Sequence, residues 1–288
     1  MRWKGRRGSV NIEDRRRRGR GDSGWLGPVG GGGLLIILLL GWFLGIDVSP
    51  LLNGLSQVQP QTAEVEERTL TPAEIEEGQF VSVVLADTEA VWGEVFDRQV
   101  GESYDPATLV LFSEITQSPC GGASGATGPF YCPADRKAYL DTAFFTTMER
   151  RLGAGGDFAA AYVVAHEIAH HVQNELGILG QANALRARVS DAQSNAISVR
   201  IELQADCFAG IWAHGAQAQF GALEPGDVEE AVNAARQIGD DTLARVSGRV
   251  PQPHTFTHGT SEQRARWFMT GYRAGDILAC DTFSTDRL

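Results

Sequence analysis

The chain has 288 residues and a formal net charge of −11, and its length fits one sizeable domain or two small ones. The charge is uneven, because residues 1–24 hold nine Arg or Lys and three acidic residues, a net of +6, which leaves −17 for the rest. A basic tail on an acidic body is typical of nucleic-acid binding or of membrane topology. The apolar stretch that follows favours the membrane, so we expect no nucleic-acid partner.

Residues 25–46 carry no charge and are numerous enough to cross a hydrocarbon core of about 30 Å as one helix. The basic residues before them predict a cytoplasmic N-terminus, with the acidic body beyond a bacterial inner membrane, in the periplasm or outside the cell. A cleaved signal peptide is the alternative. The long basic arm of residues 1–24, and the lack of a clear small-x-small site after Leu44, favour an uncleaved single-pass signal anchor.

The next segment, residues 47–79, is rich in Gln, Glu, Pro and Thr, a composition typical of a stalk between membrane and domain. We therefore expect the folded domain to span residues 80–288. Asp87 is placed to cap a helix over residues 87–100.

Strand-forming residues at 108–115 and two short extended pieces within 128–141 predict a small sheet. Helical periodicity predicts five further helices, at about 141–152, 157–176, 180–219, 224–238 and 260–275. The predicted fold class is α+β, a mostly helical domain with a small β-sheet, preceded by one transmembrane helix.

All four cysteines follow the apolar stretch. An even number in an exported domain indicates disulfides, and four cysteines allow three connectivities. We favour Cys120–Cys132, which closes a glycine-rich loop, together with Cys207–Cys280. Buried free thiols are the alternative.

Two histidines lie four residues apart in the apolar run "VVAHEIAHHVQNEL". A helix places His166 and His170 on one face, with Glu167 between them. This is the H-E-x-x-H arrangement of a zinc site, in which the glutamate acts as general base. His171 lies about 100° further round the helix, so we expect it beside the site or on the surface. A helix with surface histidines is the alternative.

A catalytic zinc normally takes three protein ligands and a water. The apolar run "RIELQADCFAGIWAHG" places Glu202 and Asp206 on one helical face. Burying unpaired carboxylates is costly, and zinc at Glu202 would relieve that cost. Asp206, one turn on, is placed to hold the far nitrogen of a ligating histidine. The sequence therefore predicts one Zn²⁺ per chain in a His₂Glu site with an open position; a solvated acidic face is the alternative.

The stretches "AHEIAHHVQ", "IELQADCFAG" and "GPFYCPADRKAYLD" resemble the bacterial putative neutral zinc metallopeptidase family, and the resemblance covers nearly the whole chain. More broadly, H-E-x-x-H followed by E-x-x-x-D is similar to the gluzincin metallopeptidases. The resemblance implies a zincin-like domain in which His166, His170 and Glu202 bind zinc. It also implies that Glu167 is the catalytic carboxylate and that Asp206 orients a histidine.

The segment "HTFTHGTSEQRARWF" resembles the histidine-containing segment that precedes a helix in several membrane gluzincins, with Gly259 in place of the usual proline. An oxyanion needs a second donor beside zinc, and His258 is our first candidate for it, Tyr139 our second. The extended residues 137–141 are a candidate edge strand for a peptide substrate, with an ordinary core strand as the alternative.

Together these features predict a membrane-anchored zinc endopeptidase acting on a peptide or protein substrate. A zinc-stabilised scaffold without catalytic activity is the second hypothesis. Glu167 argues against it, because a structural zinc site needs no base and usually fills its fourth position with protein. The sequence leaves the oligomeric state open.

Overall fold

The computed structural model describes residues 1–17, 68–124 and 128–288. The predicted membrane span at 25–46 lies outside the described residues, as does the predicted stalk up to residue 67. In the part of the chain that is described, no helix combines the length and apolar character that a bilayer crossing needs. Residues 1–15 and 71–288 form one compact unit.

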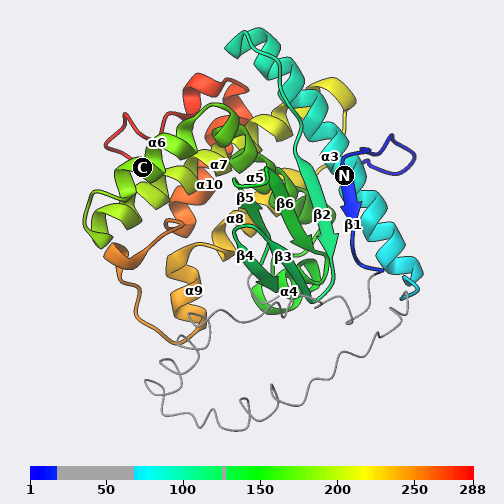
Figure 1. Ribbon diagram of the computed structural model, residues 1–288, viewed down its shortest axis with the longest axis horizontal. Coiled ribbons are helices and arrows are strands. Elements are labelled where there is room, and N and C mark those ends of the chain that lie inside the picture. The colour runs from blue at the N-terminus through cyan, green and yellow to red at the C-terminus, as the bar shows by residue number, and fades with distance from the viewer. Residues whose placement is uncertain (18–67, 125–127) are drawn as a thin grey trace. The chain divides into compact units, whose positions relative to one another are not determined.

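The main sheet has four strands in the order β1-β2-β6-β5 (Figure 1). Strands β1, β2 and β6 are parallel, and β5 runs antiparallel to β6. Their bounds are Ile12–Asp14 for β1, Thr108–Phe112 for β2, Lys137–Asp141 for β6 and Phe130–Cys132 for β5. Strands β3 (Ile115–Ser118) and β4 (Gly121–Ser124) form a separate antiparallel hairpin. The structure confirms an α+β fold, mostly helical with small sheets.

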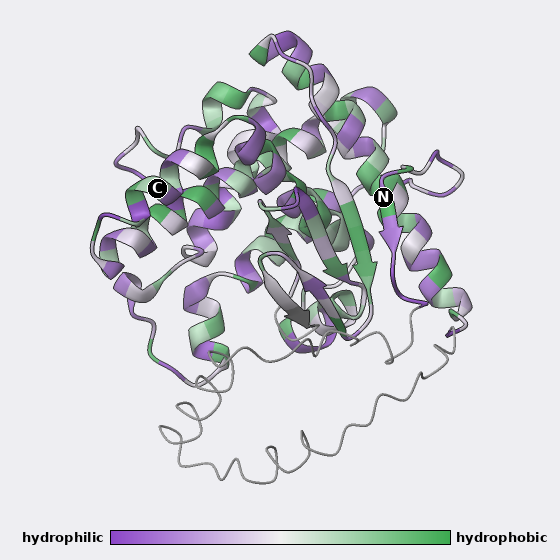
Figure 2. Cartoon of the chain, in the orientation of Figure 1, coloured by the Kyte–Doolittle hydropathy of each residue, from purple (hydrophilic) through white to green (hydrophobic). Residues whose placement is uncertain are grey.

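The candidate edge strand for a substrate was placed wrongly at residues 137–141. In the structure β6 is paired on both sides, by β2 and by β5, so its backbone groups are already committed to the sheet. The edges of the sheet are β1 and β5. Figure 2 shows hydrophobic colour along β2, as expected for an interior strand, and mixed colour on the outer helices.

Helices cover one face of this sheet. Their bounds are α3 Pro72–Val95, α4 Ala143–Leu152, α5 Asp157–Glu175, α6 Ile178–Arg186, α7 Asp191–Phe220, α8 Asp227–Gln237, α9 Asp240–Val246 and α10 Ser261–Ala274. Helix α5 is central, because it packs against α3, α7 and α8 and also contacts β5 and β6. Its residues 158–165 are buried apolar side chains, which explains why the helix runs through the core.

Two predicted helix boundaries differ from the structure. Helix α3 begins at Pro72, where Thr71 and Glu74 form a capping box, so the folded domain starts before residue 80 and residues 72–79 are not stalk. The long helix predicted over 180–219 is two helices, because Ser190 and Gln193 form a second capping box that starts α7 afresh.

The N-terminal residues also differ from expectation. Residues 1–24 were predicted as an arm separate from the domain, yet residues 1–15 belong to the same compact unit as 71–288 and supply β1. Asp87 does not cap a helix, either. It lies buried within α3, where the Arg6 guanidinium binds both of its carboxylate oxygens. Arg6, one of the basic residues near the N-terminus, therefore has a partner within the fold.

Helices α7 and α10 approach each other unusually closely. A Cβ built on Gly210 would lie 2.1 Å from the carbonyl oxygen of Phe268, and one on Gly271 would lie 1.8 Å from that of Cys207. Only glycine fits at these two contacts, because any side chain would push the helices apart. The disulfide Cys207–Cys280 fastens the chain after α10 to α7, and Cys120–Cys132 joins the hairpin to β5, so both predicted pairs are confirmed.

Candidate metal centre

The predicted metal ligands meet in the structure. His166 and His170 lie on α5, and Glu202 lies on the adjoining α7. The Nε2 atom of His166 lies 3.1 Å from Oε2 of Glu202, and Nε2 of His170 lies 3.5 Å from Oε1 of the same carboxylate. One donor atom from each residue falls within 4.8 Å of the other two. The helical-face argument from the sequence therefore placed three donors correctly around one point.

This donor set fits a zinc ion. Zinc takes imidazole nitrogens and carboxylate oxygens at about 2.0–2.2 Å, so tetrahedral ligands lie about 3.5 Å from one another. The separations between Glu202 and the two histidines are of that size. Two histidines and one carboxylate form a catalytic rather than a structural ligand set, since structural sites are normally filled by four protein ligands.

Asp206 lies where the sequence predicted it, beside the far nitrogen of His166. Its Oδ1 is 2.9 Å from Nδ1 of His166, an ion-pair contact whose angle falls short of a hydrogen bond. Burial lowers the pKa of His166, but its contacts with Asp206 and Glu202 outweigh burial and raise the pKa to about 10. A cation at this point, whether a proton or a metal, is therefore strongly favoured.

Two partners of Asp206 were missed by the sequence analysis. Arg264 on α10 donates to both carboxylate oxygens, at 2.8 and 2.9 Å, and Tyr162 on α5 donates its hydroxyl to Oδ1. We call Tyr162, His166, Asp206 and Arg264 the metal network. Arg264 is 2% exposed and Asp206 is 0% exposed. A buried aspartate requires a counter-charge, and that requirement predicts a basic partner for Asp206 without showing which residue supplies it.

The Nδ1 atom of His170, on the side of the ring away from Glu202, also has a hydrogen-bond partner, which the sequence did not predict. The oxygen of the Gln173 amide faces Nδ1 of His170 at 2.8 Å, and its nitrogen donates to the Ile201 carbonyl and to Gln204 on α7. These contacts fix which end of the amide faces His170, so Nδ1 is the protonated nitrogen and Nε2 is free to bind metal. Gln173 is three residues after His170, a spacing that puts both on one helical face and could have identified it.

Glu167 lies between the two histidines on α5, and it is partly exposed where His166 is buried. Burial raises the pKa of Glu167, while the charges of His166 and His170 act in the opposite direction. A carboxylate with a raised pKa beside a metal centre is a stronger base than an ordinary glutamate and is suited to accept and return a proton.

His258 stands on the loop before α10, which packs against α7 close to Glu202. A Cβ on Gly259 would lie 3.2–3.3 Å from the side chains of Leu203 and Val199. The Oδ2 atom of Asp240 accepts three successive backbone N–H groups, of residues 257–259, and its Oδ1 lies 3.3 Å from Nδ1 of His258. The hydrogen bond to Asp240 raises the pKa of His258, as does the charge of Glu202.

The loop also explains why glycine follows His258. Gly259 has a φ of +89°, which proline, with φ fixed near −65°, cannot adopt. His258 is exposed, and the described structure places Nδ1 toward Asp240 rather than toward a metal ligand. Its other nitrogen remains available to a substrate.

His171 lies off the metal face, as its helical position predicted, but it is fully buried rather than on the surface. Its Nε2 donates to the carbonyl of Asp105 at 2.7 Å, so Nδ1 accepts from the hydroxyl of Tyr131 on β5, 3.1 Å away. His171 therefore joins α5 to the edge strand β5.

Tyr139 does not fit the second oxyanion role. Side chains alternate across a strand, and Tyr139 packs with Val110 and Phe112, whereas its neighbours Ala138 and Leu140 join the core around α5. Its hydroxyl donates to Asp135 at 2.6 Å. The side chain of Tyr139 thus stands on the sheet face opposite the metal centre.

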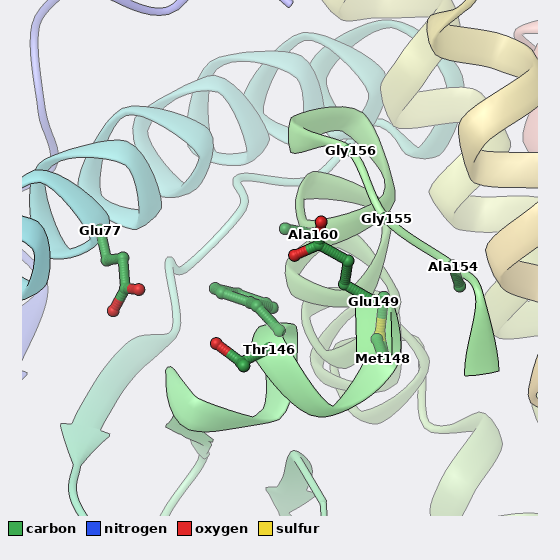
Figure 3. Close-up of a pocket in the computed structure, with 9 residues that line it drawn as sticks. Glu77, Thr146, Met148, Glu149, Ala154, Gly155, Gly156 and Ala160 are labelled. Carbon is green, nitrogen blue, oxygen red and sulfur yellow. The ribbon is translucent and has the colours of Figure 1, made fainter. Parts of the chain in front are cut away.

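A separate cavity of about 230 Å³ lies near the start of α5 (Figure 3). Its lining comes from α3, α4, the loop before α5 and the first turn of α5, and includes Glu77, Met148, Gly156 and Ala160. It shares no residue with the metal centre. We assign it no role in the chemistry at His166 and His170.

Comparisons with known proteins agree with this geometry. A family model described as "Putative neutral zinc metallopeptidase" matches residues 1–283. The chain is 47% identical over 290 residues to "Uncharacterized protein YpfJ" of Escherichia coli K12, which covers 98% of this chain and 99% of that protein. It is 44% identical over 207 residues to "Uncharacterized protein Rv2575" of Mycobacterium tuberculosis H37Rv, covering 68% of this chain and 67% of that one. No solved structure gave a significant match.

Proposed function

Since the chain belongs to the putative neutral zinc metallopeptidase family, we propose that it is a zinc-dependent endopeptidase that hydrolyses peptide bonds of peptide or protein substrates. The observation that carries this proposal is the meeting of His166, His170 and Glu202 beside Glu167, a carboxylate that no zinc-stabilised scaffold would need. The family supports a hydrolase; the endopeptidase activity and the individual roles below are our proposal.

A zinc ion held by these three residues would polarise the scissile carbonyl and make water a stronger acid. Glu167 takes the proton of the attacking water and delivers it to the leaving amine. His258 donates from its free nitrogen to the carbonyl oxygen as negative charge develops there, and Asp240 holds the imidazole in place. Asp206 and Gln173 keep the two ligating imidazoles oriented.

We place the substrate along β5 instead of β6. Strand β5 is an edge of the sheet, so one side of its backbone is unpaired within the described residues. It also contacts α5, whose His171 accepts a hydrogen bond from Tyr131. An extended peptide added to this edge would run past the helix that bears the zinc ligands.

For localisation, we propose that the domain lies outside the cytoplasm. The two disulfides support this, because such bonds persist in the periplasm or the extracellular medium and are rare in the cytosol. Thiol labelling of the protein as isolated, without reductant, tests the point. Four alkylatable thiols would overturn it.

The decisive experiment compares the full-length protein with its Glu167→Gln variant. Metal analysis should give one zinc per chain for both, and a broad peptide-library digest should show cleavage by the first alone. Equal cleavage by both would remove Glu167 from the mechanism. Zinc without cleavage in either protein would favour the scaffold hypothesis.

A further inference from the structure

The N-terminal segment, defined as residues 1–15, is built into the peptidase domain at several independent points. One set of contacts is with α3. The Arg6 guanidinium is bidentate on Asp87, which is 3% exposed. The N–H of Ser9 donates to the carbonyl of Ser82 at 2.9 Å, and the rings of Trp3 and Phe80 meet edge to face at 5.4 Å. These contacts hold the segment along the helix.

A second set of contacts is with the sheet. Strand β1 pairs in parallel with β2, so that Ile12, Glu13 and Asp14 stand opposite residues 109–111. The N–H of Leu109 donates to Asn11, and the N–H of Arg15 donates to Leu111, which extends the ladder at both ends. The segment is thus a strand of the domain's own sheet.

A third set reaches beyond the neighbouring strand. Glu13 accepts from Lys137 on β6 at 2.7 Å, and Arg15 donates to Thr116 and to the Gln117 carbonyl on the β3–β4 hairpin. At the other end of the segment, the N–H of Arg2 donates to the carbonyl of Ala222, beyond α7. The contacts therefore involve α3, all three parallel strands, the hairpin and the chain after α7.

These contacts decide a question of topology. A segment that crossed a membrane once between Arg15 and Thr71 would leave residues 1–15 on one side and 71–288 on the other. Every contact above would then be broken, and Asp87 would be left buried without its guanidinium. Burying an unpaired carboxylate is among the least favourable arrangements in a protein. One folded unit containing both parts cannot be divided by a bilayer.

We propose that residues 1–15 and 71–288 lie on the same side of the membrane. A shared side is incompatible with a single membrane crossing between Arg15 and Thr71. This replaces the single-pass arrangement expected from the positive charge before the apolar stretch. It does not depend on the proposed peptidase activity.

Cysteine accessibility in the full-length protein tests the proposal. The four native cysteines are paired, so a new exposed cysteine is the one free thiol. Val10 is 92% exposed in the N-terminal segment, and Leu278 and Val250 are 82% and 81% exposed in the domain. We would label Val10→Cys, Leu278→Cys and Val250→Cys in intact spheroplasts with a membrane-impermeant maleimide, and again after permeabilisation. Val250→Cys is the matched control for Leu278→Cys, because both positions lie in the domain and are about equally exposed.

The expected result is the same labelled fraction for Val10→Cys as for the two domain variants, whether all are labelled before permeabilisation or all only after it. Labelling of Val10→Cys alone, or of the two domain variants alone, in intact spheroplasts would overturn the proposal. Each variant must keep one thiol per chain and the parent melting temperature. Labelling of all three only after permeabilisation would support the shared side and contradict the extracytoplasmic localisation.

Discussion

The metal network and the N-terminal segment hold the domain together in opposite ways. In the metal network a few side chains from α5, α7 and α10 satisfy one another out of contact with water. In the N-terminal segment many contacts, between backbone groups as well as side chains, are spread over several elements and stay partly exposed. A buried charge network is costly to leave half satisfied, whereas a distributed set of contacts tolerates the loss of one member.

The activity of this domain therefore depends on a few buried, mutually paired side chains, whereas the attachment of its N-terminal segment depends on many separate contacts. Single changes near the metal should be severe, and single changes in the N-terminal segment should be mild. The predictions below run from the largest expected effect to the smallest.

Glu167→Gln should lower kcat/KM for peptide cleavage by about 10²–10⁴-fold, because the proton carrier is lost while the metal ligands remain. Zinc content and melting temperature should stay unchanged. Substitutions in the metal network should instead lower both zinc affinity and stability. Steady-state kinetics with metal analysis on the same preparation checks both. Loss of zinc together with activity would place Glu167 among the ligands.

Asp206→Asn should break the metal network. Removing one partner of a buried ion pair typically costs 3–5 kcal/mol, here roughly that amount because Arg264 would stay buried without its carboxylate. Zinc affinity should fall by about 10–100-fold, because Nδ1 of His166 loses the carboxylate that orients the imidazole. Denaturant unfolding and competition with a chelator measure the two effects. The matched control is Asp240→Asn, which should leave zinc affinity unchanged.

Arg6→Ala should test the N-terminal segment at its most buried contact. Asp87 would lose a bidentate partner, and we expect a loss of about 1–3 kcal/mol in unfolding free energy, the usual cost of leaving a buried polar group unsatisfied. Zinc affinity should not change, because Asp87 has no contact with the metal network. A loss as large as that of Asp206→Asn would show that the two regions do not differ as described.

Glu13→Gln should give the smallest effect, visible only in its pH dependence. Hydrogen bonding from Arg15, and less from Lys137, outweighs burial and lowers the pKa of Glu13 to about 2. A lowered carboxyl pKa stabilises the fold above its unfolded value near 4.5, and this stabilisation disappears as pH falls toward 2. Because Glu13 is 35% exposed, solvent should keep the effect below about 1 kcal/mol. The melting temperature should therefore change less with pH between pH 2 and pH 6 in Glu13→Gln than in the parent protein. The same pH dependence in both proteins would contradict the lowered pKa of Glu13.

Most of what the sequence predicts correctly is local along the chain; the exception is Cys207–Cys280, 73 residues apart, where four cysteines leave only three possible connectivities. His166 and His170, like Glu202 and Asp206, are i,i+4 pairs on single helices, so local periodicity was enough to place them. The pairing of Cys120 with Cys132 was likewise local. Arg264 was missed because no local pattern in its helix indicates that it pairs with Asp206, 58 positions earlier.

The predictions that differ from the structure have the same cause. The basic N-terminus was predicted to be an arm separate from the domain, and only the fold shows that Arg6 binds Asp87 and that Arg15 binds the β3–β4 hairpin. The order of strands in a sheet is also absent from any local pattern, which is why β6 was taken for an edge when β5 is one. Long-range pairing is settled by packing across the whole domain.

Strand β1 imposes an order of events on the newly made protein. Ile12 leaves the ribosome first, but its partner Leu109 is synthesised 97 positions later. At 5–20 residues per second, the first strand of the sheet waits roughly 5–20 s for the second. During that interval its backbone groups are open to other strands, and the apolar residues 25–46 emerge before the partner does. The domain therefore cannot fold progressively from its N-terminus, and its sheet forms only after β2 and β6 have been synthesised.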